Sequence, residues 1–427
     1  MKVGVLCIGD ELLKGAVINT NLGHMGAKLL EAGIYPQMAL EVPDRSEDVI
    51  RALKILMKET DFVLVSGGLG PTSDDLTKPA VAEFLGRKLF RSEEAVKAIT
   101  ERWASMKRGE LPLHFLSQAD IPEGAELIPN HYGTAPGIFL QLGEKDPFPG
   151  KRIAMMPGPP SELNPMFDLQ VLPLVKNALD GKLFSFLFHI AGVGESRVEE
   201  RMQKIIAAFP ALSVAYCAAP EFVKLFITSA NAETIQKASG MIRREFEKEL
   251  LSDETKSVAE EVLLLLKEKA FTLSLAESCT GGLISQLVTN VPGASEVYSG
   301  GIVCYSNEVK NRLLCVEETI LREHGAVSSQ CAGAMLEGLK KAFGSTCGIS
   351  VTGIAGPGGG TPEKPVGLVY IGVFCGENSH VGRYLFRGSR EQVRARSAAV
   401  ALNTLRCMLK GYDLSCAGSI AFTCPRS

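Results

Sequence analysis

Short apolar segments alternate with amphipathic segments along most of this chain. Residues 3–9 and 62–65 have the composition of buried strands, and residues 21–30 between them have the spacing of a helix. Strands that alternate with helices pair side by side in a mostly parallel sheet, and the helices cover its faces. The sequence therefore predicts an α/β protein.

The rhythm of this alternation changes along the chain. A chain of 427 residues is too long for one hydrophobic core, so two or three domains are expected. Residues from about 173 to 252 have the order strand, helix, strand, strand, helix, and the following residues return to α/β order. We predict four parts: a three-layer α/β/α domain over 1–172, a connecting module over 173–252, an α/β domain over 253–415 and a tail over 416–427.

The overall composition excludes several classes of protein. A net charge of -3 gives no electrostatic reason to expect nucleic-acid binding. No apolar run approaches the ~18–20 residues that a membrane-spanning helix needs. The eleven cysteines are scattered without a C-x-x-C pair, which favours a reduced, cytoplasmic protein. The six histidines do not cluster, which argues against a zinc site.

Ser278 lies at the predicted junction between a strand and a helix, in Ala276-Glu-Ser-Cys-Thr-Gly-Gly282. The N–H groups of Cys279 through Gly282 would lie in the first helical turn, where they could stabilise an oxyanion. A serine at this position is also a common helix N-cap. The adjacent glycines favour a site, because Gly-Gly at a helix start costs stability. Cys279 is a second candidate nucleophile, although its apolar neighbours favour a buried, inert thiol.

A serine nucleophile needs a base, and no histidine lies near these segments. The segment from Gly300 to Lys310 is predicted as a strand that ends in Tyr305 and Lys310. Lys310 is the candidate base, as in Ser-Lys hydrolases, and Tyr305 could relay the proton or orient the lysine.

A third segment, Thr352-Gly-Ile-Ala-Gly-Pro-Gly-Gly-Gly360, predicts a strand followed by a glycine-rich loop. It lacks the Lys-Ser/Thr ending of a P-loop, but backbone N–H groups of such a loop can bind an anion. Arg390 and Arg394, near the start of the last predicted helix, could add charge for a phosphate or could simply be solvated.

These three motifs resemble the nicotinamide mononucleotide deamidase domain of the CinA family over residues 257–412. The resemblance implies hydrolysis of nicotinamide mononucleotide to nicotinate mononucleotide and ammonia, with no metal or other cofactor. It implies that Ser278 is the nucleophile and that Tyr305 and Lys310 activate it. The predicted substrate-binding residues of this domain are Thr280, Gly281, Gly282, Thr352, Gly353, Gly356, Arg390 and Arg394.

Polar clusters also follow three predicted strands of the N-terminal block. In a parallel sheet these strand ends meet at one edge, where ligands bind. The predicted phosphate-binding residues are Gly67, Gly68, Gly70, Thr72, Gly158 and Ser161. The predicted ligands of a divalent cation are Asp10, Glu11, Asp74 and Asp75. The other interpretation of these acidic residues is helix capping.

The N-terminal block resembles the molybdopterin-binding fold, in the version that forms the N-terminal half of CinA proteins. The matching motifs lie in residues 9–15, 67–75, 133–137 and 157–163. The resemblance implies metal-dependent hydrolysis of ADP-ribose to AMP and ribose 5-phosphate. Two alternatives stay open: a molybdopterin-type binding module without this activity, and a scaffold linked to competence or DNA repair.

The connecting module resembles a KH-like fold, but Gly192-Val-Gly194 is not the G-x-x-G clamp of RNA-binding KH domains. We therefore expect a spacer or dimer-forming role and a homodimer, with nicotinamide mononucleotide and ADP-ribose as substrates and neither nucleic acid nor membrane as partner.

Overall fold

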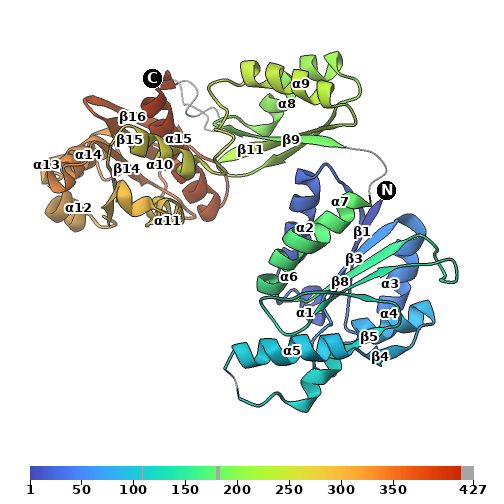
Figure 1. The fold of residues 1–427 in the computed structure, drawn as a ribbon. Helices are drawn as coiled ribbons and strands as arrows, with labels where there is room; N and C mark the ends of the chain where they lie inside the picture. Colours follow the sequence, from blue (N-terminus) through green and yellow to red (C-terminus); the bar gives the residue numbers. More distant parts are fainter. Residues whose placement is uncertain (108, 179–182, 415–427) are drawn as a thin grey trace. The chain divides into compact units, whose positions relative to one another are not determined.

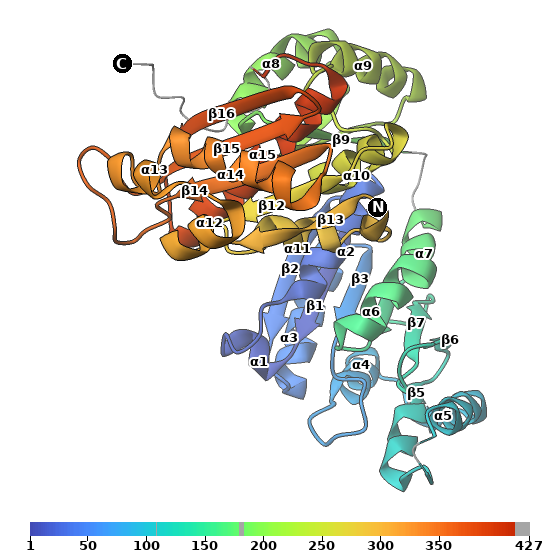
Figure 2. The ribbon, with the colours of Figure 1, turned by 90° about the vertical axis from the view of Figure 1, so that its left-hand side faces the viewer.

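The computed structural model describes residues 1–107, 109–178 and 183–414. The chain divides into two compact units, Met1–Ser185 and Phe186–Ser427 (Figures 1 and 2). The connecting module and the C-terminal domain both belong to the second unit, so a separate fold for each stays a prediction. The predicted tail over 416–427 lies outside the described residues.

The first unit is built on a six-stranded sheet. Four neighbouring strands are parallel and two antiparallel strands extend one edge. In spatial order the strands are β2 (Pro36–Val42), β1 (Val3–Ile8), β3 (Phe62–Ser66), β8 (Arg152–Met156), β7 (Gly137–Gln141) and β6 (Glu126–Ile128). Every residue of β1 and β3 is buried, as expected for parallel strands covered on both faces.

Helices cover both faces of this sheet, which confirms the predicted three-layer arrangement (Figure 1). One face packs against α3 (Ser46–Glu59) and α4 (Thr77–Leu85), and the other against α2 (Thr20–Glu31), α6 (Pro160–Met166) and α7 (Leu172–Asn177). The remaining elements of this unit are α1 (Asp10–Leu13), β4 (Leu89–Arg91), α5 (Glu93–Ser105), η1 (Leu113–Ala119), β5 (Asp120–Pro122) and η2 (Phe167–Val171).

The second unit begins with the predicted βαββα module. Its three-stranded sheet has the order β10-β11-β9 and carries two helices. The elements are β9 (Phe184–Ala191), α8 (Glu195–Ala208), β10 (Ser213–Ala218), β11 (Phe222–Ser229) and α9 (Ala232–Glu245). All five follow the predicted order of strand, helix, strand, strand and helix.

The C-terminal domain contains a five-stranded sheet with three parallel and two antiparallel strands. In spatial order they are β13 (Tyr298–Val303), β12 (Leu273–Glu277), β14 (Cys347–Gly353), β15 (Leu368–Cys375) and β16 (Asn378–Leu385). The edge strand β16 is not expected from the sequence, because it is mostly polar and only partly buried.

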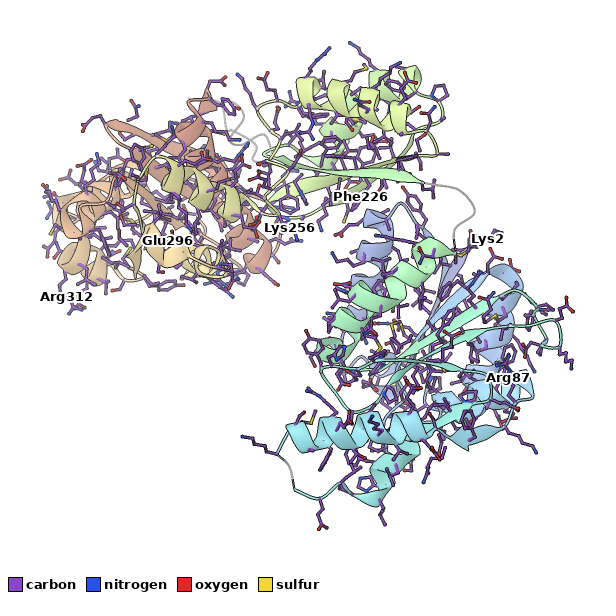
Figure 3. The ribbon with its side chains drawn as sticks, viewed as in Figure 1. Lys2, Arg87, Phe226, Lys256, Glu296 and Arg312 are labelled. Atoms are coloured by element: carbon purple, nitrogen blue, oxygen red, sulfur yellow. The ribbon has the colours of Figure 1, made fainter. Side chains whose placement is uncertain are left out.

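Helices cover both faces of this sheet as well. One face packs against α10 (Val258–Glu268), α11 (Leu283–Thr289) and α15 (Arg390–Lys410), and the other against α12 (Asn307–Leu314), α13 (Glu318–Glu323) and α14 (Ser329–Phe343). A short helix, η3 (Ala294–Glu296), precedes β13. Figure 3 shows side chains filling the space between these layers.

The module and the C-terminal domain share buried contacts within the second unit. Arg406 of α15 is fully buried and donates to Leu250 O at 3.1 Å and to Lys248 O at 2.8 Å. Phe222 of β11 belongs to the same apolar core as Val258 of α10. Both contacts cross the predicted boundary at residue 252.

Within the described ranges, no helix has the length and apolar character needed to cross a membrane.

Candidate functional site

Ser278 directly follows β12, which lies between β13 and β14 in the sheet, and the residue is 8% exposed. Its backbone N–H donates to Val351 O of β14 at 2.9 Å, so the sheet holds the residue in place. Lys310 Nζ lies 3.0 Å from Ser278 Oγ and donates to it. The structure thus brings the predicted nucleophile and base together.

Lys310 lies on α12, not at the end of a strand as predicted. Strand β13 ends at Val303, and the side chain of Ser306 then caps α12 by accepting a hydrogen bond from Val309 N. This difference matters, because a helix turns Lys310 back towards β12.

The surroundings of Lys310 suit a proton acceptor. Its side chain is 1% exposed, and Nζ also donates to Cys304 O at 2.7 Å and to Tyr305 O at 3.4 Å. Among the described residues no carboxylate pairs with Nζ. The three contacts match the three donors of a lysine ammonium and hold Nζ against the Ser278 hydroxyl, within reach for a proton transfer.

Tyr305 contacts Lys310 through its backbone carbonyl. Its side chain is 62% exposed, and its hydroxyl accepts a hydrogen bond from Arg390 Nη2 at 3.1 Å. The structure thus places the Tyr305 hydroxyl against Arg390 and only its backbone carbonyl against Lys310, so the relaying or orienting role of the side chain stays a prediction.

Arg390 and Arg394 both face this site from the first turns of α15. Arg390 Nη1 donates to Gly356 O of the glycine-rich loop at 2.7 Å. Arg394 Nη2 donates to Thr280 O at 2.7 Å. Two guanidinium groups thus lie beside the Ser278 turn and the loop, which favours the anion-binding interpretation over simple solvation. The Thr280 hydroxyl is buried without a partner in the described structure.

Glu277 organises the turn after β12, a role that the sequence analysis missed. Its carboxylate is 1% exposed and accepts hydrogen bonds from Gly282 N at 3.0 Å, Ile284 N at 3.0 Å and Ser285 N at 2.8 Å. An acidic residue just before the predicted helix start was the available signal, because carboxylates commonly satisfy free N–H groups there.

This capping corrects the predicted set of oxyanion donors. Helix α11 begins at Leu283, and the preceding turn uses Gly281 N to reach Ser278 O at 3.1 Å. Gly282 N is bound by Glu277. The N–H groups of Cys279 and Thr280 remain without an acceptor among the described residues.

Backbone conformation explains the two glycines of this turn. Gly281 and Gly282 have φ values of 59° and 93°, which favour glycine. The nearest atoms to a Cβ at these positions would be 3.6 Å and 3.7 Å away. The positive φ values of the turn, and not a crowding neighbour, therefore explain why both residues are glycines.

Other predicted residues of this site have structural contacts of their own. Burial raises the pKa of the Cys279 thiol to about 12, which agrees with an inert thiol. The Thr352 hydroxyl is buried and donates to Ala326 O at 2.7 Å. Gly353 packs against the backbone of Leu368 too closely for a side chain. These contacts position the start of the glycine-rich loop.

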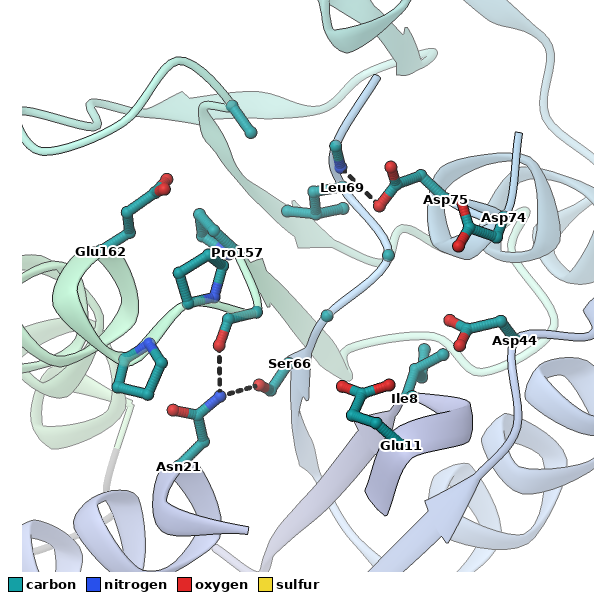
Figure 4. Close-up of a pocket in the computed structure, with 18 of the residues that line it drawn as sticks. Ile8, Glu11, Asn21, Asp44, Ser66, Leu69, Asp74, Asp75, Pro157 and Glu162 are labelled. Atoms are coloured by element: carbon teal, nitrogen blue, oxygen red, sulfur yellow. Dashed lines mark hydrogen bonds between the residues drawn. The ribbon is translucent and has the colours of Figure 1, made fainter. Parts of the chain in front are cut away.

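The first unit contains a cavity of about 570 Å³ at the carboxyl ends of its parallel strands (Figure 4). Four of the predicted phosphate-binding residues line it, whereas Thr72 and Ser161 do not; the lining glycines are Gly67, Gly68, Gly70 and Gly158. Asn21 of α2 also lines it and was not predicted. Its Nδ2 donates to Ser66 Oγ at 2.9 Å and to Gly158 O at 2.7 Å, and its buried Oδ1 has no partner in the described structure.

The predicted metal ligands are only partly brought together. Glu11, Asp74 and Asp75 line the cavity, but Asp10 does not and pairs with Lys14 at 2.6 Å. Asp75 accepts hydrogen bonds from Gly70 N and Thr72 N, both at 2.8 Å, and so holds the loop after β3 in shape.

Asp44 completes the acidic side of the cavity and was not predicted. Burial raises its pKa, and the negative charges of Glu11, Asp10 and Asp74 add to the effect. It follows β2, a further parallel strand, so the rule that placed the other clusters at strand ends could have found it.

Among the described residues, no group of three or more His, Cys, Asp or Glu side chains is arranged to hold a metal ion. The described residues therefore offer no complete metal cage of their own. Mg²⁺ commonly binds one or two carboxylates together with substrate phosphates. Asp44, Glu11 and Asp74 fit that kind of site, since they face the cavity that the glycine loop also lines (Figure 4).

Family models match both ends of the chain. Residues 255–409 match the CinA C-terminal domain, and residues 4–177 match a family described as "Probable molybdopterin binding domain". A CinA-like protein of Dictyoglomus turgidum is 42% identical over 414 residues, which cover 95% of this chain and 98% of that protein. A CinA-like protein of Citrifermentans bemidjiense is 40% identical over 408 residues, which cover 95% of this chain and 97% of that protein.

Solved structures match parts of the chain. The competence/damage inducible protein CihA of Agrobacterium tumefaciens is 35% identical with a TM-score of 0.35, over 36% of this chain and 93% of that one. The CinA protein of Thermoplasma acidophilum is 30% identical with a TM-score of 0.37, over 42% of this chain and 99% of that one.

Proposed function

The chain belongs to the CinA family, and from this premise we propose that its C-terminal domain deamidates nicotinamide mononucleotide to nicotinate mononucleotide and ammonia. The contact of 3.0 Å between Lys310 Nζ and Ser278 Oγ carries the proposal. Both residues are buried beside a turn that leaves two N–H donors free, as a serine amidase requires.

The proposed reaction proceeds through an acyl-enzyme. Ser278 Oγ attacks the carboxamide carbon while its proton passes to Lys310 Nζ. The N–H groups of Cys279 and Thr280 stabilise the oxyanion, and Lys310 returns the proton to the departing nitrogen, which leaves as ammonia. Water, activated by the same amine, then attacks the ester and releases the carboxylate. Arg390 and Arg394 supply positive charge for the 5′-phosphate.

Replacing the nucleophile tests this proposal. In Ser278→Ala, ammonia release from nicotinamide mononucleotide should fall by at least about 10³-fold, because N–H donors alone give only residual catalysis. The matched control is Cys279→Ala at the neighbouring position, whose protonated thiol contributes no nucleophile, so it should retain ammonia release. Wild-type turnover in Ser278→Ala would reject the assignment, and loss in Cys279→Ala alone would transfer it to the thiol.

For the N-terminal domain we propose metal-dependent hydrolysis of ADP-ribose to AMP and ribose 5-phosphate. The observation that favours it is the cavity lined by Gly68 and Gly158, whose N–H groups have no acceptor among the described residues, and by the carboxylates of Asp44, Glu11 and Asp74. The N–H groups would bind the pyrophosphate, and the carboxylates would hold a divalent cation against it. The cation would neutralise charge on the phosphates during attack by water.

Chelation separates the two proposed activities. Removing divalent cations should stop the release of AMP from ADP-ribose, whereas ammonia release from nicotinamide mononucleotide should continue. Adding Mg²⁺ back should restore AMP release in the wild type and much less in Asp44→Asn. If AMP release survives chelation, the metal role is rejected. If the chain binds a pterin and releases no AMP with any divalent cation, the molybdopterin-type binding module is the better description.

A further inference from the structure

Two cysteines lie opposite each other on neighbouring antiparallel strands of the C-terminal sheet. Cys347 is the first residue of β14, Cys375 is the last of β15, and the two are partners in the strand ladder. Both are free thiols in the structure. Neither takes part in the reaction proposed at Ser278.

The hydrogen bonds around the two cysteines show that they form a non-hydrogen-bonded pair of the antiparallel ladder. Cys347 N donates to Thr272 O on the β12 side, so its backbone groups point away from β15. The neighbouring pair, Thr346 and Gly376, is instead hydrogen-bonded between the two strands, since Gly376 N donates to Thr346 O at 2.9 Å. Pairs without mutual hydrogen bonds have Cα atoms about 4.5 Å apart, and disulfides span Cα separations of about 4.4–6.8 Å. The backbone can thus accept a disulfide without moving the strands.

The two thiols differ in exposure. Cys347 is buried, whereas Cys375 is partly exposed beside the turn that joins β15 to β16. The neighbouring Cys347 thiol and, to a smaller extent, the positive charge of Lys269 lower the pKa of Cys375 against the effect of burial, whereas the pKa of Cys347 is raised. Cys375 is therefore the accessible nucleophile, and Cys347 lies in position to displace a group from it.

We propose that Cys347 and Cys375 are a reversible oxidation site for small disulfides. The Cys375 thiolate attacks one sulfur of the small disulfide, a new S–S bond forms, and one small thiolate leaves. Cys347 transfers its proton to the small thiolate that has left and attacks the Cys375 sulfur, and the second small thiolate leaves and takes up a proton from water. The two protein thiols are oxidised to one disulfide, and the small disulfide is reduced to two thiols.

This site is separate from the Ser278 chemistry. Cys347 begins β14, whereas Ser278 N contacts Val351, four residues further along the same strand. At about 3.3 Å per residue that is roughly 13 Å of strand. The cross-link would close the segment between β14 and β15, which contains the glycine-rich loop, and so restrain that hairpin when the domain unfolds.

Oxidised glutathione at pH 7.5 is the probe, applied to the reduced full-length chain, and peptide mapping by mass spectrometry is the readout. We expect a linked peptide pair that contains Cys347 and Cys375 and that disappears with dithiothreitol. Cys375→Ser should lose the linked pair. The matched control Cys217→Ser removes an exposed thiol on β10 and should keep it.

Cys347→Ala provides the second test. With no thiol to displace it, glutathione should accumulate on Cys375 as a mixed disulfide that dithiothreitol removes. The proposal is overturned if glutathione stays on Cys375 in the wild type without a link to Cys347. It is equally overturned if Cys375 stays unmodified while Cys217 reacts.

Discussion

Lys310→Arg places a guanidinium at the buried position beside Ser278 and removes the amine that we propose as the acceptor of the Ser278 proton. Guanidinium cannot serve as a base, and its planar fork does not match the two carbonyl acceptors of Nζ. We expect a fall in kcat of at least about 10³-fold for ammonia release. The matched control is Lys341→Arg on α14, an exposed lysine that should retain full turnover.

A melting curve must accompany the Lys310 variant, because Lys310 is 1% exposed. Loss of turnover with a retained melting transition identifies a chemical role. Turnover near that of wild type in Lys310→Arg would show that the base lies elsewhere.

At the scale of elements, the start of helix α11 depends on one carboxylate. Glu277→Ala removes the acceptor of three backbone N–H groups, and we expect the free energy of unfolding to fall by about 1–3 kcal/mol. Ammonia release should fall as well, because the turn that holds Ser278 loses its support. Thermal unfolding and kcat measure the two effects.

Glu277→Gln keeps one acceptor oxygen and should lie between wild type and Glu277→Ala in stability. The control is Glu296→Gln, which changes an exposed ion pair with Lys267 and should shift stability by less than about 1 kcal/mol. Equal stability of Glu277→Ala and wild type would contradict the capping role.

At the scale of the whole molecule, we expect the connecting module and the C-terminal domain to fold together as one cooperative unit. A fragment from residue 186 to the C-terminus keeps the acceptors of Arg406, and it should fold and release ammonia. A fragment from residue 251 loses Lys248 O and Leu250 O and leaves a buried guanidinium short of partners. We expect it to be less stable by several kcal/mol, as measured by urea unfolding of soluble protein. A stable, active fragment from 251 would show that the C-terminal domain completes its own core.

The local sequence pattern was enough to predict the α/β class, most helices and strands, and the motif around Ser278. Apolar periodicity follows directly from which face of an element is buried, and glycine and serine mark the turns that follow strands. The same reasoning failed for β16, because an edge strand needs no apolar face, and it missed Asp44 and Glu277.

The sequence by itself thus predicted most of the order of helices and strands and named Ser278, Tyr305 and Lys310 as a set. Only the tertiary structure decided how they meet: α12 turns Lys310 towards Ser278, and Tyr305 contributes its carbonyl to that lysine. It also decided that Asp75 holds a loop and that Cys347 lies opposite Cys375. These relations depend on strand order and on hydrogen bonds between residues far apart in the chain, and a local pattern contains no information about either.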